Sequence, residues 1–470
     1  MILKKQTNKI CLILIFIGLS YSIFNSIFYT KKFDRFFINS QGDETHYLIK
    51  NDTYHYWSQA ELYKTDIQNG KGILKSGGEL ERNYLYPKII AVYYLLIQEN
   101  IKDENGRLKL NNYKFGIPIF QSLLFYVSLL FLYSKIKRQF DNIIVIYIVL
   151  FLSLNPSIIQ FHAAYWTESI YFSLLLIFLS FLINLPKKNY KYFLFGIFLG
   201  IMYMQRGVTL LLFIPLVFYF FWIYRYAALK KCVLFIFGYF FVILFIGYEN
   251  YQKSGFFYFT TFTQSNAHYS YVSHILNAKK FNIDESASLK LKNSERVIFF
   301  TKNKIVLGGN NFMGTANVGD MLKVSKYERD YFLQSLKGNF FYFAKYHLYK
   351  SIQAMIIGYD YVSLAYTRDK SQSHLFLKNE YKKQIYSQFF YSLIIYGILL
   401  IGTIRIILSK STKYKNMLFM ILLMSAYNIA LLGWMGVGRY LIVNQIFYSI
   451  LFAFGFEKII NFIRFNLFRK

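Results

Sequence analysis

The chain has 470 residues, of which 55% are hydrophobic, 21% aromatic and only 17% charged. Soluble domains usually carry about a quarter charged residues, so this composition argues against a soluble fold and favours a membrane protein. The net charge of +30 raises nucleic acid as a partner, but the basic residues lie between apolar runs, so no nucleic-acid binding is expected. Cys11 and Cys232 both lie inside apolar runs, which argues against a disulfide framework or a cysteine metal site.

Ten apolar stretches approach the length of about 20 residues that a transmembrane helix needs. In chain order they are residues 10–29, 115–133, 142–160, 166–185, 191–205, 207–224, 232–249, 386–408, 416–434 and 440–457. The pair 191–205 and 207–224 is the least regular, because both stretches are short and they meet at Arg206. The predicted fold is an all-α, polytopic integral membrane protein.

The first stretch follows Lys4, Lys5 and Lys9, as the apolar region of a signal peptide would. It is long for such a region, and no clear A-x-A cleavage site follows it. We therefore expect residues 1–29 to form an uncleaved anchor helix.

Lys and Arg are distributed unevenly between the connections. The rich set comprises Lys4, Lys5, Lys9, Lys135, Lys137, Arg138, Lys187, Lys188, Lys191, Arg225, Lys230, Lys231, Lys410, Lys413, Lys415, Lys458, Arg464, Arg469 and Lys470. The alternate connections hold only Arg206 and Arg439. Because short cytoplasmic connections are enriched in Lys and Arg, both termini are predicted to be cytoplasmic.

This orientation places two long segments, residues 30–114 and 250–385, outside the membrane. Residues 115–249 would then form a helical core, and residues 386–470 the last helices and a cytoplasmic tail. The residue usage and the lack of disulfides favour a bacterial inner (plasma) membrane.

Two short acidic clusters open the first outer segment, at Asp43-Glu44 and at Asp52. Asp52, Tyr56 and Ala60 repeat every four residues, which predicts one face of a helix that Asp52 caps or opens. Solvated loop acids are the alternative interpretation of both clusters.

Further charges lie at the outer ends of predicted spans: Glu168, with His162 nearby, then Arg206 and Arg439. Charge at membrane depth is costly and usually marks function or a tight pair. The structural alternatives are an acid stabilised by a helix N-terminus, and arginines that extend to the headgroups. Gathered at one end of several helices, these groups suit displacement at a sugar carbon. A carboxylate would act as base, and arginines would bind a phosphate leaving group.

Several short elements follow one another in order along residues 10–224 and 420–457. They are Asp52, Tyr56 and Ala60; Arg82 with Tyr86-Pro87; Asn155-Pro156 leading to Glu168; Gly196, Gly200 and Arg206; and Gly438-Arg439-Tyr440. In type and order the set resembles the GT-C superfamily of membrane glycosyltransferases, which includes protein O-mannosyltransferases and lipid A aminoarabinose transferases. Leu441–Phe456 lacks the proline typical of the superfamily, and residues 250–385 are unlike its compact outer domain.

The resemblance implies inverting transfer of a sugar from a polyprenyl-phosphate donor to a glycan, lipid or protein acceptor. Asp52 matches the acidic residue of the family's first outer loop, so the resemblance implies that Asp52 is the base, with Asp43 or Glu44 as alternatives. Glu168 is a further catalytic candidate. Arg206 and Arg439 would bind the donor phosphate, and Tyr56, Arg82 and His162 would contact substrate. Some family members use a divalent metal, which this sequence neither shows nor excludes.

Two other functions stay open. An O-antigen or exopolysaccharide polymerase would rely on arginines in outer segments and would not need Asp52. A lipid-linked sugar flippase or transporter would place charges near the membrane midplane, often within repeats.

Overall fold

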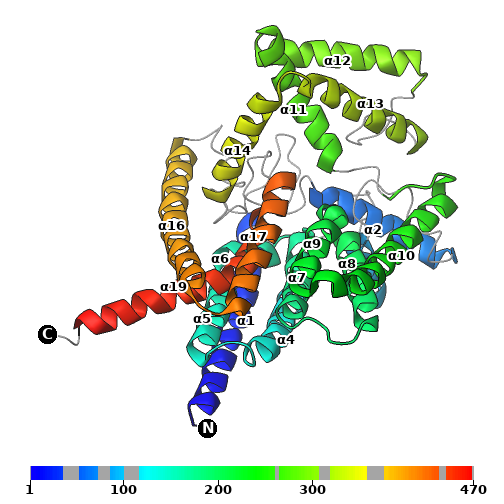
Figure 1. The fold of residues 1–470 in the computed structure, drawn as a ribbon. Helices are drawn as coiled ribbons and strands as arrows, with labels where there is room; N and C mark the ends of the chain where they lie inside the picture. The colour runs from blue at the N-terminus through cyan, green and yellow to red at the C-terminus, as the bar shows by residue number, and fades with distance from the viewer. Residues whose placement is uncertain are drawn as a thin grey trace.

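The computed structural model describes residues 2–34, 52–71, 85–99, 116–259, 264–305, 318–356, 375–432 and 441–467. Within these ranges every regular element is a helix, which confirms the all-α class (Figure 1). The first half contains α1 (Ile2–Asp34), α2 (Asp52–Gln68), α3 (Leu85–Leu96), α4 (Gly116–Ile136), α5 (Asn142–Leu154), α6 (Pro156–Ile159), η3 (Gln160–His162), α7 (Glu168–Ile183), α8 (Tyr190–Gln205), η4 (Gly207–Leu211), α9 (Phe213–Tyr224), η5 (Arg225–Ala227) and α10 (Ala228–Ser254). The second half contains α11 (Gln264–Phe281), α12 (Glu285–Lys302), α13 (Val318–Leu336), α14 (Phe340–Ile356), α16 (Leu375–Leu408), α17 (Thr412–Leu432) and α19 (Asn444–Leu467).

Six helical stretches among the described residues are long and apolar enough to cross a membrane. The number is seven if α5 and the Pro156–His162 helix, bent by 40°, form one span. A polytopic membrane protein is thereby confirmed, whereas the count of ten spans is not. The numbers differ because the two spans predicted at 207–224 and 232–249 fall in one stretch, because α5 and the Pro156–His162 helix are separated by a bend, and because α7 and α8 have only 16 residues each. That length is about 24 Å of helix, against a hydrocarbon core of about 30 Å.

One of the six stretches, Gly207–Ser254, has 48 residues and folds back on itself. It is divided at Arg225, whose φ is +53°. Gly196 of α8 abuts Phe235 of α10, and Gly200 abuts Val242 further along, so α8 and α10 run in the same direction. The chain between them, η4 and α9, must therefore return through the bundle.

The predicted anchor helix α1 packs along α4 and α5. The hydroxyls of Ser22 and Ser122 share a hydrogen bond of 2.9 Å, and both serines are buried. A Cβ at Gly18 would lie 2.4 Å from the Ser153 carbonyl oxygen, so glycine permits the close approach of α1 to α5. Small residues play this part at many membrane helix interfaces.

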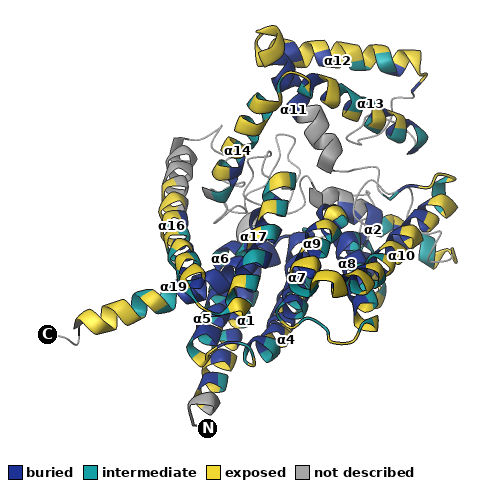
Figure 2. Cartoon of the chain, in the orientation of Figure 1, coloured by how far each residue is buried: buried dark blue, intermediate teal, exposed yellow. Residues whose placement is uncertain are grey.

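Exposed residues lie along the outside of the bundle helices (Figure 2), and many of them are large and apolar. Phe218 and Trp222 of α9, and Phe237 and Phe241 of α10, are each more than half exposed. Such a surface is unfavourable in water but is the expected face of a helix that contacts lipid.

The second long segment contains its own helical unit, built from α11 to α14, which lies away from the N-terminus (Figure 1). Val272 and Leu276 of α11 pack with Phe332 of α13. Lys292 of α12 forms a buried ion pair of 2.9 Å with Glu328 of α13. The unit is therefore an ordered helical layer beyond the bundle.

The contact between α16 and α19 gives a prediction about packing. A Cβ at Gly455 would lie 2.0 Å from the Ile398 carbonyl oxygen, whereas a Cβ at Gly397 would meet nothing within 4 Å. We expect Gly455→Ala to lower stability by about 1–3 kcal/mol, because the helices must separate. Gly397→Ala is expected to be neutral or stabilising by up to about 1 kcal/mol, since alanine favours helix. Cys11 and Cys232 are buried free thiols, so a thiol-reactive dye during heating measures both variants. Equal melting temperatures would contradict the packing.

Candidate active site

Buried polar side chains gather at one end of the helical bundle. We call this the loop end: it is formed by residues 155–168, 205–209 and 249–259, and both long segments leave from it. The opposite, basic end carries the connections Lys135–Arg138, Lys187–Lys191, Arg225–Lys231 and Lys410–Lys415.

A buried ion pair joins α7 and α8 at the loop end. Glu168 is the first residue of α7, and Arg206 follows the last residue of α8 in an extended conformation (φ −153°, ψ 118°). Arg206 Nη2 lies 3.3 Å from Glu168 Oε1, and both side chains are shielded from solvent. The guanidinium also lies 5.6 Å from the ring centroid of Tyr171. The structure thus brings together two residues that the sequence placed in separate roles.

The neighbouring backbone is fixed by hydrogen bonds from amide side chains. Gln205 Nε2 donates to the Thr167 carbonyl at 2.9 Å, which ties the end of α8 to the start of α7. Gln121 Nε2 of α4 donates to the carbonyls of His162 and Ala164 at 2.9 and 3.0 Å. These bonds hold the irregular stretch before Glu168 in one conformation.

His162 lies in η3, which precedes Glu168 in the chain, and its side chain is fully buried. Its Nδ1 shares a hydrogen bond of 2.6 Å with the hydroxyl of Ser169. Its Nε2 has no hydrogen-bond partner among the described residues. The ring centroid lies 4.7 Å from that of Phe125. The imidazole is therefore held in place by Ser169 and Phe125, with one ring nitrogen left for a further partner.

Helices α2 and α3 of the first long segment extend the same polar layer. Tyr56 is buried with its ring 5.3 Å from that of Tyr86, edge to face. The Tyr86 hydroxyl donates to Gln121 Oε1 at 3.0 Å. Burial, together with the nearby Tyr56 and Glu168, raises the pKa of Tyr86 well above its usual value, so the phenol stays protonated as a donor.

The helix predicted from the four-residue repeat is confirmed, and Asp52 is its first residue. Tyr56 and Ala60 on the same face are both buried. Asp52 occupies the position one turn before Tyr56, at the end of α2 that follows the first span. The first long segment also contains the short apolar helix α3, of 12 residues, which carries Tyr86 and Pro87.

The remaining predicted site residues lie outside the described residues. They are Asp43, Glu44, Arg82 and Arg439. The ends of the segment that contains Arg439 are nevertheless placed: Asn428 Nδ2 donates to Asn444 Oδ1 at 2.8 Å, and Asn155 Nδ2 donates to Gln445 Oε1 at 3.0 Å. The Tyr427 hydroxyl donates to the Val208 carbonyl, close to Arg206 in the chain. The described residues on either side of 433–440 therefore lie at the loop end.

A second buried ionic cluster was missed by the sequence analysis. Glu249, near the end of α10, lies 3.2 Å from Lys88 Nζ of α3 and 2.8 Å from Lys253 Nζ. Lys253 also donates to the Tyr63 hydroxyl of α2 at 3.2 Å. The sequence contained a signal for this cluster, because Glu249 is an isolated carboxylate at the end of a predicted span, as Glu168 is. This cluster fixes α2 and α3 against the bundle.

No group of three His, Cys, Asp or Glu side chains within the described ranges is arranged to hold a metal ion. A cavity of about 590 Å³ lies instead at the basic end, between α5, α16, α17 and α19. None of the residues that line this cavity belongs to the loop end.

Comparison with known proteins agrees with the geometry. Residues 107–248 match the family model described as dolichyl-phosphate-mannose-protein mannosyltransferase. The matched segment contains His162, Glu168 and Arg206, and ends one residue before Glu249. No curated protein and no solved structure matches the chain. The match confirms the resemblance to GT-C-type membrane glycosyltransferases over α4 to most of α10, and indicates that the protein is a membrane glycosyltransferase.

Proposed function

We propose that the protein transfers a sugar from a polyprenyl-phosphate donor to a glycan, lipid or protein acceptor at the loop end of the bundle. The observation that carries the proposal is the buried Glu168–Arg206 pair, because it lies inside the family-matched segment and because Glu168 acts electrostatically on Tyr86, which packs on Tyr56 of α2. A guanidinium held at the boundary of the apolar bundle suits the phosphate of a lipid whose tail remains in the bilayer.

Glu168 orients Arg206 in this proposal. Its carboxylate contacts Nη2 of the guanidinium, and the ring of Tyr171 lies close to the same guanidinium. Arg206 then stabilises the charge that develops on the donor phosphate as the sugar–oxygen bond breaks. Glu168 is thereby a positioning residue, and Arg439 on the adjoining segment would supply a second phosphate contact.

The Asp52 carboxylate is the proposed base. It removes the proton from the acceptor hydroxyl as that oxygen attacks the anomeric carbon, and the polyprenyl phosphate leaves from the opposite face. The transfer therefore inverts the configuration at the sugar. Asp43 or Glu44 would take this role if Asp52 does not.

The proposed orientation places the loop end outside a bacterial inner (plasma) membrane and both termini in the cytoplasm. The basic connections at the opposite end support it. Thiol labelling of cysteines introduced singly in both connections of intact cells would test the sidedness directly.

The test of function is a choice between donors. Purified protein in lipid vesicles would receive radiolabelled polyprenyl-phosphate monosaccharides or polyprenyl-diphosphate oligosaccharides, each with a crude surface-glycan acceptor. Transfer of single sugars from the monophosphate supports the proposal. Linkage of preassembled oligosaccharides would instead identify a polymerase, and vesicle uptake of intact donor without cleavage would identify a transporter.

A further inference from the structure

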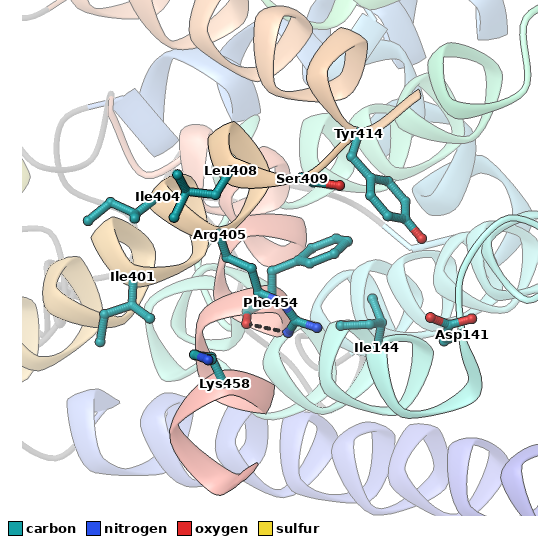
Figure 3. Close-up of a pocket in the computed structure, with 10 residues that line it drawn as sticks. All are labelled: Asp141, Ile144, Ile401, Ile404, Arg405, Leu408, Ser409, Tyr414, Phe454 and Lys458. Atoms are coloured by element: carbon teal, nitrogen blue, oxygen red, sulfur yellow. Dashed lines mark hydrogen bonds between the residues drawn. The ribbon is translucent and has the colours of Figure 1, made fainter. Parts of the chain in front are cut away.

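The cavity at the basic end has two chemically different parts (Figure 3). One wall is aliphatic, formed by Ile401, Ile404 and Leu408 of α16, whereas Ile144 of α5 lies on the other side of Arg405, toward Asp141. Ile404 is 47% and Leu408 77% exposed, so the apolar wall continues onto the outer surface of the bundle. The opposite part is lined by Arg405 of α16 and Lys458 of α19, with Asp141, Ser409, Tyr414 and Phe454 completing the lining.

The Arg405 guanidinium is held in place by contacts that leave some of its N–H donors available. Its Nη1 donates to the Phe454 carbonyl at 2.9 Å, drawn as the dashed line in Figure 3, and to the Glu457 carboxylate. The ring of Phe454 lies 5.3 Å away. Both bonds use Nη1, so Nε and Nη2 are available to a ligand. Lys458 is exposed at the same cavity.

The surroundings carry strong positive charge. The stretches 137–141, 405–415 and 457–458 contain seven basic residues and two acidic ones. A cavity of about 590 Å³ is large enough for a polar headgroup together with the first part of a hydrocarbon chain. Basic pockets between transmembrane helices are suited to anionic headgroups.

We propose that this cavity binds an anionic phospholipid. The headgroup phosphate would contact Arg405 and Lys458, and one acyl chain would lie against Ile401, Ile404 and Leu408. The site is separate from the loop-end layer, so it does not depend on the proposed transfer reaction. A lipid bound here would join α16 to α5 and α19, and stabilise the C-terminal helices.

Native mass spectrometry of the detergent-purified full chain tests the proposal. The protein would be titrated with dioleoyl phosphatidylglycerol or dioleoyl phosphatidylcholine, and bound lipid counted. We expect tighter binding of phosphatidylglycerol, weakened about five-fold by Lys458→Gln, the effect of about 1 kcal/mol per basic residue. Ile404→Trp, which fills the cavity, is expected to weaken it as well.

Two matched variants keep the test decisive. Lys230 is an exposed lysine at the basic end outside the cavity, and Ile407 is an exposed apolar residue of α16 that does not line it. Lys230→Gln and Ile407→Trp should leave phosphatidylglycerol binding unchanged. Equal binding of the two lipids, or equal loss in Lys230→Gln and Lys458→Gln, would overturn the proposal. Full displacement of the lipid by millimolar inorganic phosphate would assign the cavity to phosphate alone and also overturn it.

Discussion

Arg206→Gln is expected to lower sugar transfer by at least about 10²-fold and to destabilise the protein by about 3–5 kcal/mol. The loss of stability follows from the fully buried Glu168 carboxylate, which would lose its contact with the Arg206 guanidinium. The loss of transfer follows from the missing donor to the leaving phosphate. Transfer from the polyprenyl-phosphate donor and dye-monitored melting measure the two effects separately.

The double variant Glu168→Gln/Arg206→Gln separates structure from chemistry. Two neutral amides can replace the ion pair, so melting should return close to that of the wild type. Transfer should remain lost, because no guanidinium faces the donor. Arg206→Lys keeps the charge but loses the planar fork, and intermediate transfer is expected. Wild-type transfer by the double variant would show that the pair is only a structural link between α7 and α8.

Glu249→Ala is expected to release the first long segment from the bundle. The change leaves Lys88 and Lys253 without the carboxylate that both contact, at a cost of about 3–5 kcal/mol. Because Lys88 belongs to α3 and Tyr63, a partner of Lys253, belongs to α2, both helices should loosen. Limited proteolysis at residues 72–84 would report that loosening, and transfer should fall with it.

A nearby exposed pair provides the control for Glu249. Lys71 contacts Asp66 on α2 with 57% of its side chain exposed, so Lys71→Ala should cost less than about 1 kcal/mol. If both variants resist protease equally, the buried cluster does not fix α2 and α3.

Several features could be read from the sequence because they depend on local pattern. The repeat Asp52, Tyr56, Ala60 predicted α2 from its first residue. Glu168 and Arg206 were identified because each is an isolated charge at the end of an apolar run. The all-α membrane fold followed from the apolar stretches themselves.

Other features depend on tertiary contacts, which no local pattern contains. The sequence placed Glu168 and Arg206 at the same end of the bundle, but no local pattern shows that α7 and α8 bring the two side chains into contact, so the Glu168–Arg206 pair was not predicted. Gln121 and Tyr86 are neutral, and only their burial reveals that they support this layer. The count of ten spans is not confirmed, in part because α7 and α8 are each shorter than a perpendicular crossing needs.

The most direct test of the account is single-turnover transfer by Asp52→Asn, with Asp66→Asn as the matched change in the same helix. Radiolabelled sugar leaving the polyprenyl phosphate would be followed in vesicles, together with binding of the donor. The account predicts that Asp52→Asn binds donor normally but transfers about 10²–10⁴-fold more slowly, since it lacks a general base, while Asp66→Asn behaves as wild type. Transfer by Asp52→Asn at the wild-type rate would contradict the assignment of Asp52 as the base of the reaction.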